Sequence, residues 1–412
     1  MSPEPKPTAL ENVPIGVTPG TRLSLLLAAA CAILLLPVAA TAGPPPGGIL
    51  LNENYGQSTT YLSRCSLLRG DTKMWNCYVA RLFADVQKSK DPANELPRID
   101  RKVRAGGGYL ENNCHMMMHV VGRMFARKNH VTLANLQRYL PRSNDPGCSA
   151  GFGMGMVMAL GNQIGRLGPD GAVKLCEQAP TRFRSYTCVH TLGHAYMRLY
   201  HGQLAFGVRA CRTLPANDAP DCAQGAYHDY WLSIAGRDSA QRPKHAQTSA
   251  RVVCSRQIRS FVRPCWYRYY LELPPKKLPT NAVGVRRLCT GLGGVQRAGC
   301  IGAAALITST DPFRQMRVCA RLGSTDGTSC LYGVNVQNLA DAKGAERVRL
   351  IEQCGKMPRT ARDACYEWLG TALAVVTNGR FQARACPFIS RQGRQPCIAG
   401  ARRMNDALVT FS

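Results

Sequence analysis

Apolar residues recur along the chain at the spacing of amphipathic helices. Tyr366–Val376 carries apolar side chains at helical spacing, and Asn378-Gly379 follows it as a typical helix stop. Arg347–Cys354 has the pattern of the end of a helix, while Asp218 and Pro220 supply an N-cap and an early proline for another. The pattern predicts many short helices of about 10–16 residues, which are marginally stable alone.

The cysteines repeat with a regular period. Nine steps separate Cys77 from Cys397, which gives about 36 residues per step and suits one helical hairpin per repeat. Most cysteines form pairs that are 11 or 12 residues apart, and each pair would join the end of one helix to the start of the next. The predicted disulfides are Cys65–Cys77, Cys176–Cys188, Cys211–Cys222, Cys254–Cys265, Cys289–Cys300, Cys319–Cys330, Cys354–Cys365 and Cys386–Cys397.

The expected fold is therefore all-α: a disulfide-stapled solenoid of about ten helical hairpins. Each closed loop would contribute roughly 2–3 kcal/mol to stability. Over roughly residues 60–405 the layout resembles exported disulfide-bridged Sel1-like and tetratricopeptide-type repeat proteins. The motifs Cys-Val-His-Thr-Leu-Gly-His (188–194) and Cys-His-Met-Met-Met-His (114–119) also resemble an uncharacterised bacterial family with repeated Cys/His/Gly helix starts. Neither resemblance implies an activity.

The amino terminus has the pattern of an export signal. An apolar run, Leu23–Ala40, follows Arg22 and ends in the small-residue sequence Ala40-Thr41-Ala42. The run is close to the roughly 20 residues that span a bilayer, so a retained anchor is the alternative, with membrane contact only through residues 23–42. Cleavage would remove Cys31 and leave 18 of the 19 cysteines in an oxidising compartment.

These patterns divide the chain into four parts. We expect a signal peptide or anchor over residues 1–42, a linker over 43–60, repeats with a histidine and methionine cluster over 61–240, and cysteine-paired repeats over 241–412. The protein should reside in the periplasm, in the cell envelope or outside the cell, with or without an amino-terminal membrane anchor.

Five of the eight histidines occupy similar positions in successive repeats. Counted from the cysteine near the start of each unit, Met154, His194 and His228 stand at position +6 and His119 at +5. Equivalent positions in stacked repeats form a ladder, and residues four apart share a helix face. Imidazole suits copper or zinc, added thioether favours Cu(I), and haem iron is a lesser variant. The predicted metal ligands are His115, His119, Met154, His190, His194 and His228. The alternative is that these side chains are ordinary core groups.

Cys114 and Cys148 lack a partner 11 residues upstream. They would either serve as thiolate ligands or pair with each other, and an oxidising compartment favours the pairing.

The chain is strongly basic, with 52 Lys and Arg against 25 Asp and Glu and a net charge of +27. Basic and aromatic residues are interleaved over Arg251–Lys277, which indicates a site for anionic ligands. Outside the cytosol the expected partners are an anionic envelope polymer, lipid or an acidic protein, and nucleic acid is unlikely. The alternative is a solvated basic face over a core of aromatics. The predicted residues are Arg256, Arg259, Arg263, Trp266 and Arg268.

Catalytic signatures are absent from the sequence. It contains no His-Glu-x-x-His, Gly-x-Ser-x-Gly or phosphate-binding Gly-x-x-x-x-Gly-Lys-Ser/Thr motif. His228-Asp229 could act in acid–base chemistry, but no nucleophile accompanies it. The sequence leans away from an enzyme. It favours a metal-binding envelope protein, with a basic interaction scaffold as the alternative.

Overall fold

The computed structural model describes a part of the chain that begins after the predicted signal and linker. The described residues are 62–89, 91–106, 108–141, 148–178, 182–234, 247–272, 279–309, 311–334, 344–377, 386, 389 and 391–402. Within them the regular structure is entirely helical, as the apolar periodicity predicts. The predicted signal or anchor lies outside these residues. No helix among those described is both long and apolar enough to cross a membrane.

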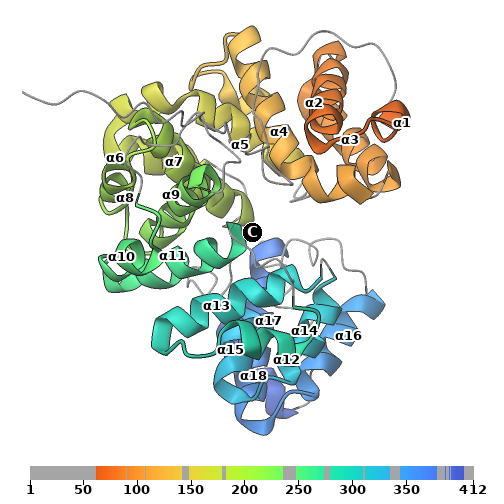
Figure 1. Ribbon diagram of the computed structural model, residues 1–412, viewed down its shortest axis with the longest axis vertical. Coiled ribbons are helices and arrows are strands. Elements are labelled where there is room, and N and C mark those ends of the chain that lie inside the picture. The colour runs from red at the N-terminus through yellow and green to blue at the C-terminus, as the bar shows by residue number, and fades with distance from the viewer. Residues whose placement is uncertain are drawn as a thin grey trace, which may run out of the picture. The chain divides into compact units, whose positions relative to one another are not determined.

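Ten helices form what we call the core row, because each carries one cysteine of the 36-residue ladder. Each core-row helix packs against the next one along the chain, and Figure 1 shows them following one another in chain order. This is the arrangement of a helical solenoid. The core row consists of α2 (Asp71–Lys88), α4 (Gly108–Lys128), α5 (Cys148–Ala159), α7 (Arg182–Leu199), α9 (Ala219–Ile234), α11 (Arg259–Glu272), α13 (Gly294–Ile307), α15 (Ser324–Leu331), α17 (Arg359–Thr377) and α18 (Arg391–Arg402).

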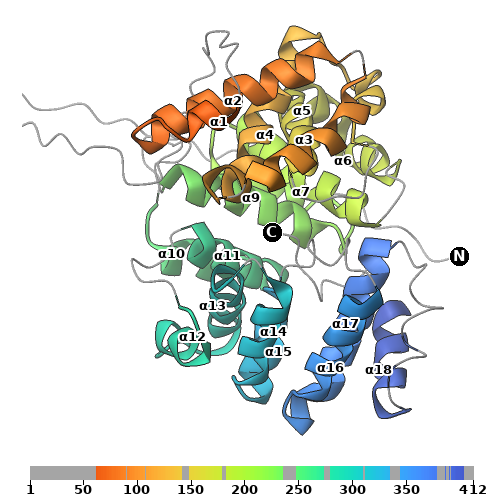
Figure 2. The same cartoon turned by 90° about the vertical axis from the view of Figure 1, so that its right-hand side faces the viewer.

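Further helices, most of them short, lie before and between the members of the core row. In Figure 2 the connecting helix α16 lies beside α17, which in turn lies beside α18. The boundaries match the sequence signals closely, since α17 ends at Thr377 directly before Asn378-Gly379 and α9 begins at Ala219 directly after Asp218. The connecting elements are α1 (Leu62–Cys65), α3 (Pro92–Gly106), the 3₁₀ turn η1 (Leu136–Arg138), α6 (Gly161–Glu177), α8 (Leu204–Cys211), α10 (Ala250–Ser255), α12 (Ala282–Leu288), α14 (Pro312–Ala320) and α16 (Gly344–Gly355).

Nine disulfides staple this arrangement. The eight predicted from spacing are all present, and each closes a loop of 11 or 12 residues beside a core-row helix. The ninth joins Cys114 to Cys148 and links α4 directly to α5. The pairing therefore excludes both thiolates as metal ligands in the oxidised protein. So many disulfides indicate an extracytoplasmic location.

Neighbouring core-row helices approach closely because glycine faces backbone. A Cβ at Gly151 would collide with the carbonyl oxygen of His115, and a Cβ at Gly155 would collide with that of His119. The contact repeats after four residues in both helices, so α4 and α5 run in the same direction with a register offset of one repeat. Gly225 on α9 meets the carbonyl oxygen of His190 on α7 in the same way. These contacts bring the histidine-bearing helices to a distance that larger residues would not permit.

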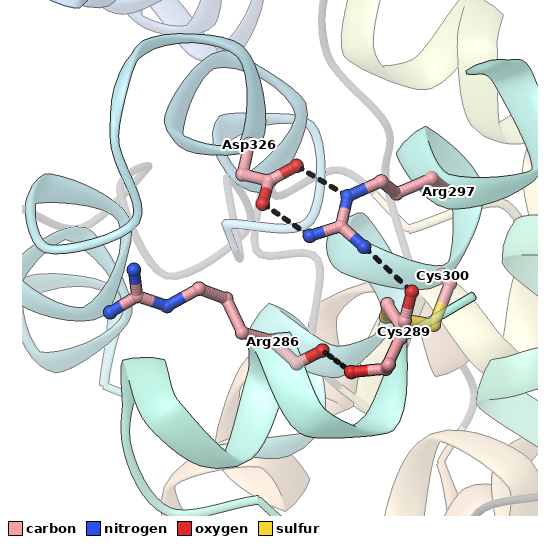
Figure 3. Close-up of a disulfide and its surroundings, with 6 residues drawn as sticks. Arg286, Cys289, Arg297, Cys300 and Asp326 are labelled. Carbon is pink, nitrogen blue, oxygen red and sulfur yellow. Dashed lines mark hydrogen bonds and ion pairs between the residues drawn. A yellow bond between two sulfur atoms is a disulfide. The ribbon is translucent and has the colours of Figure 1, made fainter. Parts of the chain in front are cut away.

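An ion pair joins two repeats in the carboxy-terminal half (Figure 3). The Arg297 guanidinium on α13 donates from Nε and one terminal nitrogen to the two carboxylate oxygens of Asp326 on α15, at 2.9 and 2.6 Å. Its other terminal nitrogen donates to the carbonyl oxygen of Cys289 at 2.7 Å. The Asp326 carboxylate raises the pKa of Arg297. The fork thus connects one repeat, its neighbour and a disulfide loop, although such a partly exposed pair contributes at most about 1 kcal/mol.

Buried side chains of the described residues form two large core clusters along the row. One cluster extends from Cys65 to Trp266 and a second includes Ala282 to Cys397. Trp231 on α9 lies edge-on to Tyr269 on α11, with ring centroids 5.0 Å apart. Packing is therefore continuous across residue 240, the position at which the sequence analysis divides the repeats. That division stays a prediction.

Gly225→Ala tests whether α9 packs on α7 through this close glycine contact. The added methyl group would push α9 from α7, so we expect the free energy of unfolding to fall by about 1–3 kcal/mol, the usual cost of overpacking. Denaturant titration without reductant, so that the disulfides stay intact, measures this free energy. The matched control is Gly355→Ala on α16, where a Cβ would meet only the Tyr366 hydroxyl at 3.5 Å. Equal stability of the two variants would contradict the packing argument.

Candidate metal centre

Three core-row helices bring the five phased histidines together. His115 and His119 lie on α4, His190 and His194 on α7, and His228 on α9. The ring centroids of His119 and His194 are 5.7 Å apart, and those of His194 and His228 are 4.9 Å apart. The side chains that the sequence placed on one wall of the solenoid therefore meet in one cluster.

Each i, i+4 pair has its two Nε2 atoms facing each other. The Nε2 atoms of His115 and His119 are 3.1 Å apart, and those of His190 and His194 are also 3.1 Å apart. Two nitrogens bound to one tetrahedral zinc ion, each at about 2.0–2.1 Å, lie about 3.3 Å from each other. Each pair therefore has the spacing of either a hydrogen bond between imidazoles or two ligands of one cation.

Three of the imidazoles form a group that can hold a metal ion. One ring nitrogen from each of His190, His194 and His228 lies within 4.8 Å of the other two. The side chains are deeply buried, with exposed fractions of 2%, 0% and 8%.

Carboxylates of the next repeat orient two of these rings. His194 Nδ1 donates to Asp229 Oδ1 at 2.7 Å, and His228 Nε2 lies 3.2 Å from Glu272 Oε1. A donating Nδ1–H leaves the lone pair of neutral His194 on Nε2, the atom that faces His190. Carboxylates behind histidine rings are common in metal sites, where they fix the tautomer and raise the basicity of the ligand.

The two carboxylates share a position that the sequence analysis missed. Asp229 stands seven residues after Cys222, and Glu272 stands seven residues after Cys265. Each carboxylate therefore stands one residue after position +6 of its own repeat. It contacts the histidine at position +6 of the preceding repeat. Only these two units have an acidic residue at position +7. Comparing position +7 across the repeats would therefore have identified Glu272 from the sequence.

Polar side chains from α7, α9 and α11 surround this end of the cluster. Arg268 is buried, and its terminal nitrogens lie 3.4 Å from Glu272 Oε1 and 3.2 Å from Gln224 Oε1. The Tyr186 hydroxyl donates to the same Gln224 oxygen, and its ring stacks on His190 with centroids 5.9 Å apart. The network holds Glu272 beside His228 and closes one side of the site.

Burial favours the neutral form of three of the imidazoles. The pKa values of His119, His190 and His228 lie well below the usual value because burial penalises the charged ring. The neighbouring His115 lowers the pKa of His119 further, and Arg268 lowers those of the other two. Neutral imidazole is the form that binds metals. Burial by itself raises the pKa of Asp229, but the interactions with His194, Arg198 and Arg123 outweigh it, so that this pKa is lowered and the carboxylate stays ionised.

Several buried polar atoms in the cluster lack a hydrogen-bond partner. They are Nδ1 of His190, Nδ1 of His228 and Oδ2 of Asp229. Buried polar atoms in folded proteins are nearly always paired. A cation could bind Nδ1 of His228, whereas a cation shared by the facing Nε2 atoms of His190 and His194 leaves Nδ1 of His190 to another partner.

The remaining predicted residues come from α5 and from the segment Arg256–Arg268. Met154 is buried on α5, which packs against both α4 and α7. Among the proposed anion-binding residues, Arg256 and Arg259 are exposed, whereas Trp266 and Arg268 are buried. The Arg263 guanidinium lies over the Tyr332 ring, 3.8 Å from its centroid. An anionic partner would therefore meet Arg256 and Arg259, while Arg268 serves the histidine cluster.

Comparison with known protein families, with curated proteins and with solved structures finds no match to this chain. The architecture is consistent with Sel1-like repeats in its paired helices and regular disulfides, and the function has to be argued from the site itself.

The depressed pKa values predict that stability falls in mild acid. Below about pH 6.5 these histidines take up protons in the unfolded chain but stay neutral in the folded protein, so the free energy of unfolding falls as the pH falls. Each contributes at most about 1.4 kcal/mol per pH unit. Denaturant titrations from pH 7.5 to 5.5 with a chelator present would measure the slope. We expect a smaller slope for His228→Asn and an unchanged one for His201→Asn, which alters an exposed turn; equal slopes in the two variants would contradict the assignment.

Proposed function

We propose that this is an exported helical-repeat protein that binds a transition metal through His190, His194 and His228. The observation that carries the proposal is the group of three buried imidazole nitrogens within 4.8 Å of one another. Carboxylates behind two of the rings and the lowered pKa values of two of them support the same conclusion.

The chemistry of the donors favours Zn²⁺ or Cu²⁺. Both ions suit imidazole nitrogen, and copper binds such sites more tightly when both metals are present. Three histidine ligands leave a fourth position on zinc for water or a small molecule, which is the ligand count of catalytic rather than structural zinc sites. A thioether from Met154 would tilt the preference toward Cu(I), and haem iron is the least favoured reading because the donors crowd around one point.

The location belongs to the same proposal. The disulfides suggest an extracytoplasmic protein, and we assign export to the segment Leu23–Ala40, with the mature chain in the periplasm or cell envelope. The competing function is a basic scaffold that binds an anionic polymer, lipid or acidic protein. It rests on the net charge of +27 and on exposed residues such as Arg256 and Arg259.

Metal analysis tests the proposal directly. Protein purified from an exporting host should hold at least one equivalent of copper or zinc. We expect His194→Asn combined with His228→Asn to lose that metal, because two of three ligands disappear, while His201→Asn retains it. Circular dichroism and the disulfide count would verify that the variants fold. Wild-type protein that binds no added Zn²⁺ or Cu²⁺, yet binds anionic polymer in a salt-sensitive manner, would favour the scaffold.

A further inference from the structure

We propose that the cluster is a dinuclear centre, with a second metal ion bound by His115 and His119. This inference rests on the proposed function, since it adds a neighbour to the ion at His190, His194 and His228. The two positions belong to different helices of the core row and use separate sets of ligands.

The first argument is geometric equivalence. His115 and His119 on α4 repeat the arrangement of His190 and His194 on α7, with the same four-residue spacing and the same Nε2–Nε2 distance of 3.1 Å. The ring centroids are 4.8 Å apart in the pair on α4 and 4.9 Å apart in the pair on α7. If one pair is spaced to share a cation, the other pair is spaced for it equally well.

The second argument concerns burial and charge. His119 is 2% exposed, and its surroundings include the rings of His115 and His194. Neutral imidazole is the form that binds a cation, and in this pair His119 is buried while His115 is partly exposed. The carboxylate of Asp229, which accepts a hydrogen bond from His194, supplies a negative charge inside the same cluster, to which Arg123 and Arg268 add positive charge.

The third argument is proximity. The His119 and His194 rings are in edge-to-face contact with centroids 5.7 Å apart, so the two ligand sets adjoin each other. Two-metal sites place their ions about 3.5–4 Å apart and use both to bind one small ligand. A two-histidine set leaves more open positions than a three-histidine set. Those positions would take water, hydroxide or a small bridging anion.

The α5 helix explains how the two sets come into register. Gly151 and Gly155 of α5 lie against the backbone of His115 and His119, and the Cys114–Cys148 disulfide fixes the start of α5 to α4. Because α5 also packs against α7, it sets the distance between the two histidine pairs. The simpler reading is that each pair only shares one N–H as a hydrogen bond, and metal stoichiometry distinguishes the two.

The experiment is a titration of chelator-treated, disulfide-intact protein with Co²⁺ and then with Zn²⁺. Wild-type protein should bind two equivalents of Co²⁺, and electron paramagnetic resonance should show coupling between the ions. His115→Asn combined with His119→Asn should bind one equivalent and lose the coupling. The control His130→Asn, on the exposed turn after α4, should keep two.

Each other outcome is decisive. Wild-type binding of one equivalent that survives His115→Asn with His119→Asn overturns the second ion but leaves the proposed function standing. If the wild type binds one equivalent, and both the His115/His119 double variant and the His194/His228 double variant lose it, a single ion is shared by all these ligands. That result also overturns the inference. No binding by the wild type overturns both proposals. The wild-type count requires no variant, so the inference stays testable if the double variant does not fold.

Discussion

The contact between a glycine of one core-row helix and a backbone carbonyl of the helix before it determines which side chains of this protein can meet. Gly151 and Gly155 bring α5 against α4, and Gly225 brings α9 against α7. At such short separations, residues one repeat apart in the sequence become neighbours in space. The register of 35 to 36 residues is therefore set by backbone packing, and the histidine ladder inherits it.

The disulfides and the buried cluster have complementary roles. Short helices are marginal by themselves, and closing the loops at their ends restricts the unfolded chain. That stability permits the core to contain groups that normally weaken a fold, namely four imidazoles, two carboxylates and the Arg268 guanidinium. Such groups require partners when buried, and the hydrogen bonds from His194 to Asp229 and from Arg268 to Glu272 supply part of them.

The sequence predicts the scaffold better than the site. Spacing alone identified eight disulfides, because a loop of 11 or 12 residues is a local feature, whereas Cys114–Cys148 spans two repeats and stayed one of two alternatives. The sequence also predicted that His119, His194 and His228 meet, because they stand at nearly the same position in their repeats and stacked repeats bring equivalent positions together. Arg268 was assigned to a basic surface because composition does not reveal the direction of a side chain, and its burial beside Glu272 appears only when α11 packs on α9.

The pairing of position +6 with position +7 of the following unit has a consequence for how such a chain can change length. Repeat proteins commonly gain or lose whole modules, since each module contacts only its neighbours. Here the units entered at Cys188, Cys222 and Cys265 are interlocked by His194–Asp229 and His228–Glu272. Duplication or deletion within that trio would separate an imidazole from its counterion, so copy-number variation should be confined to the units outside it.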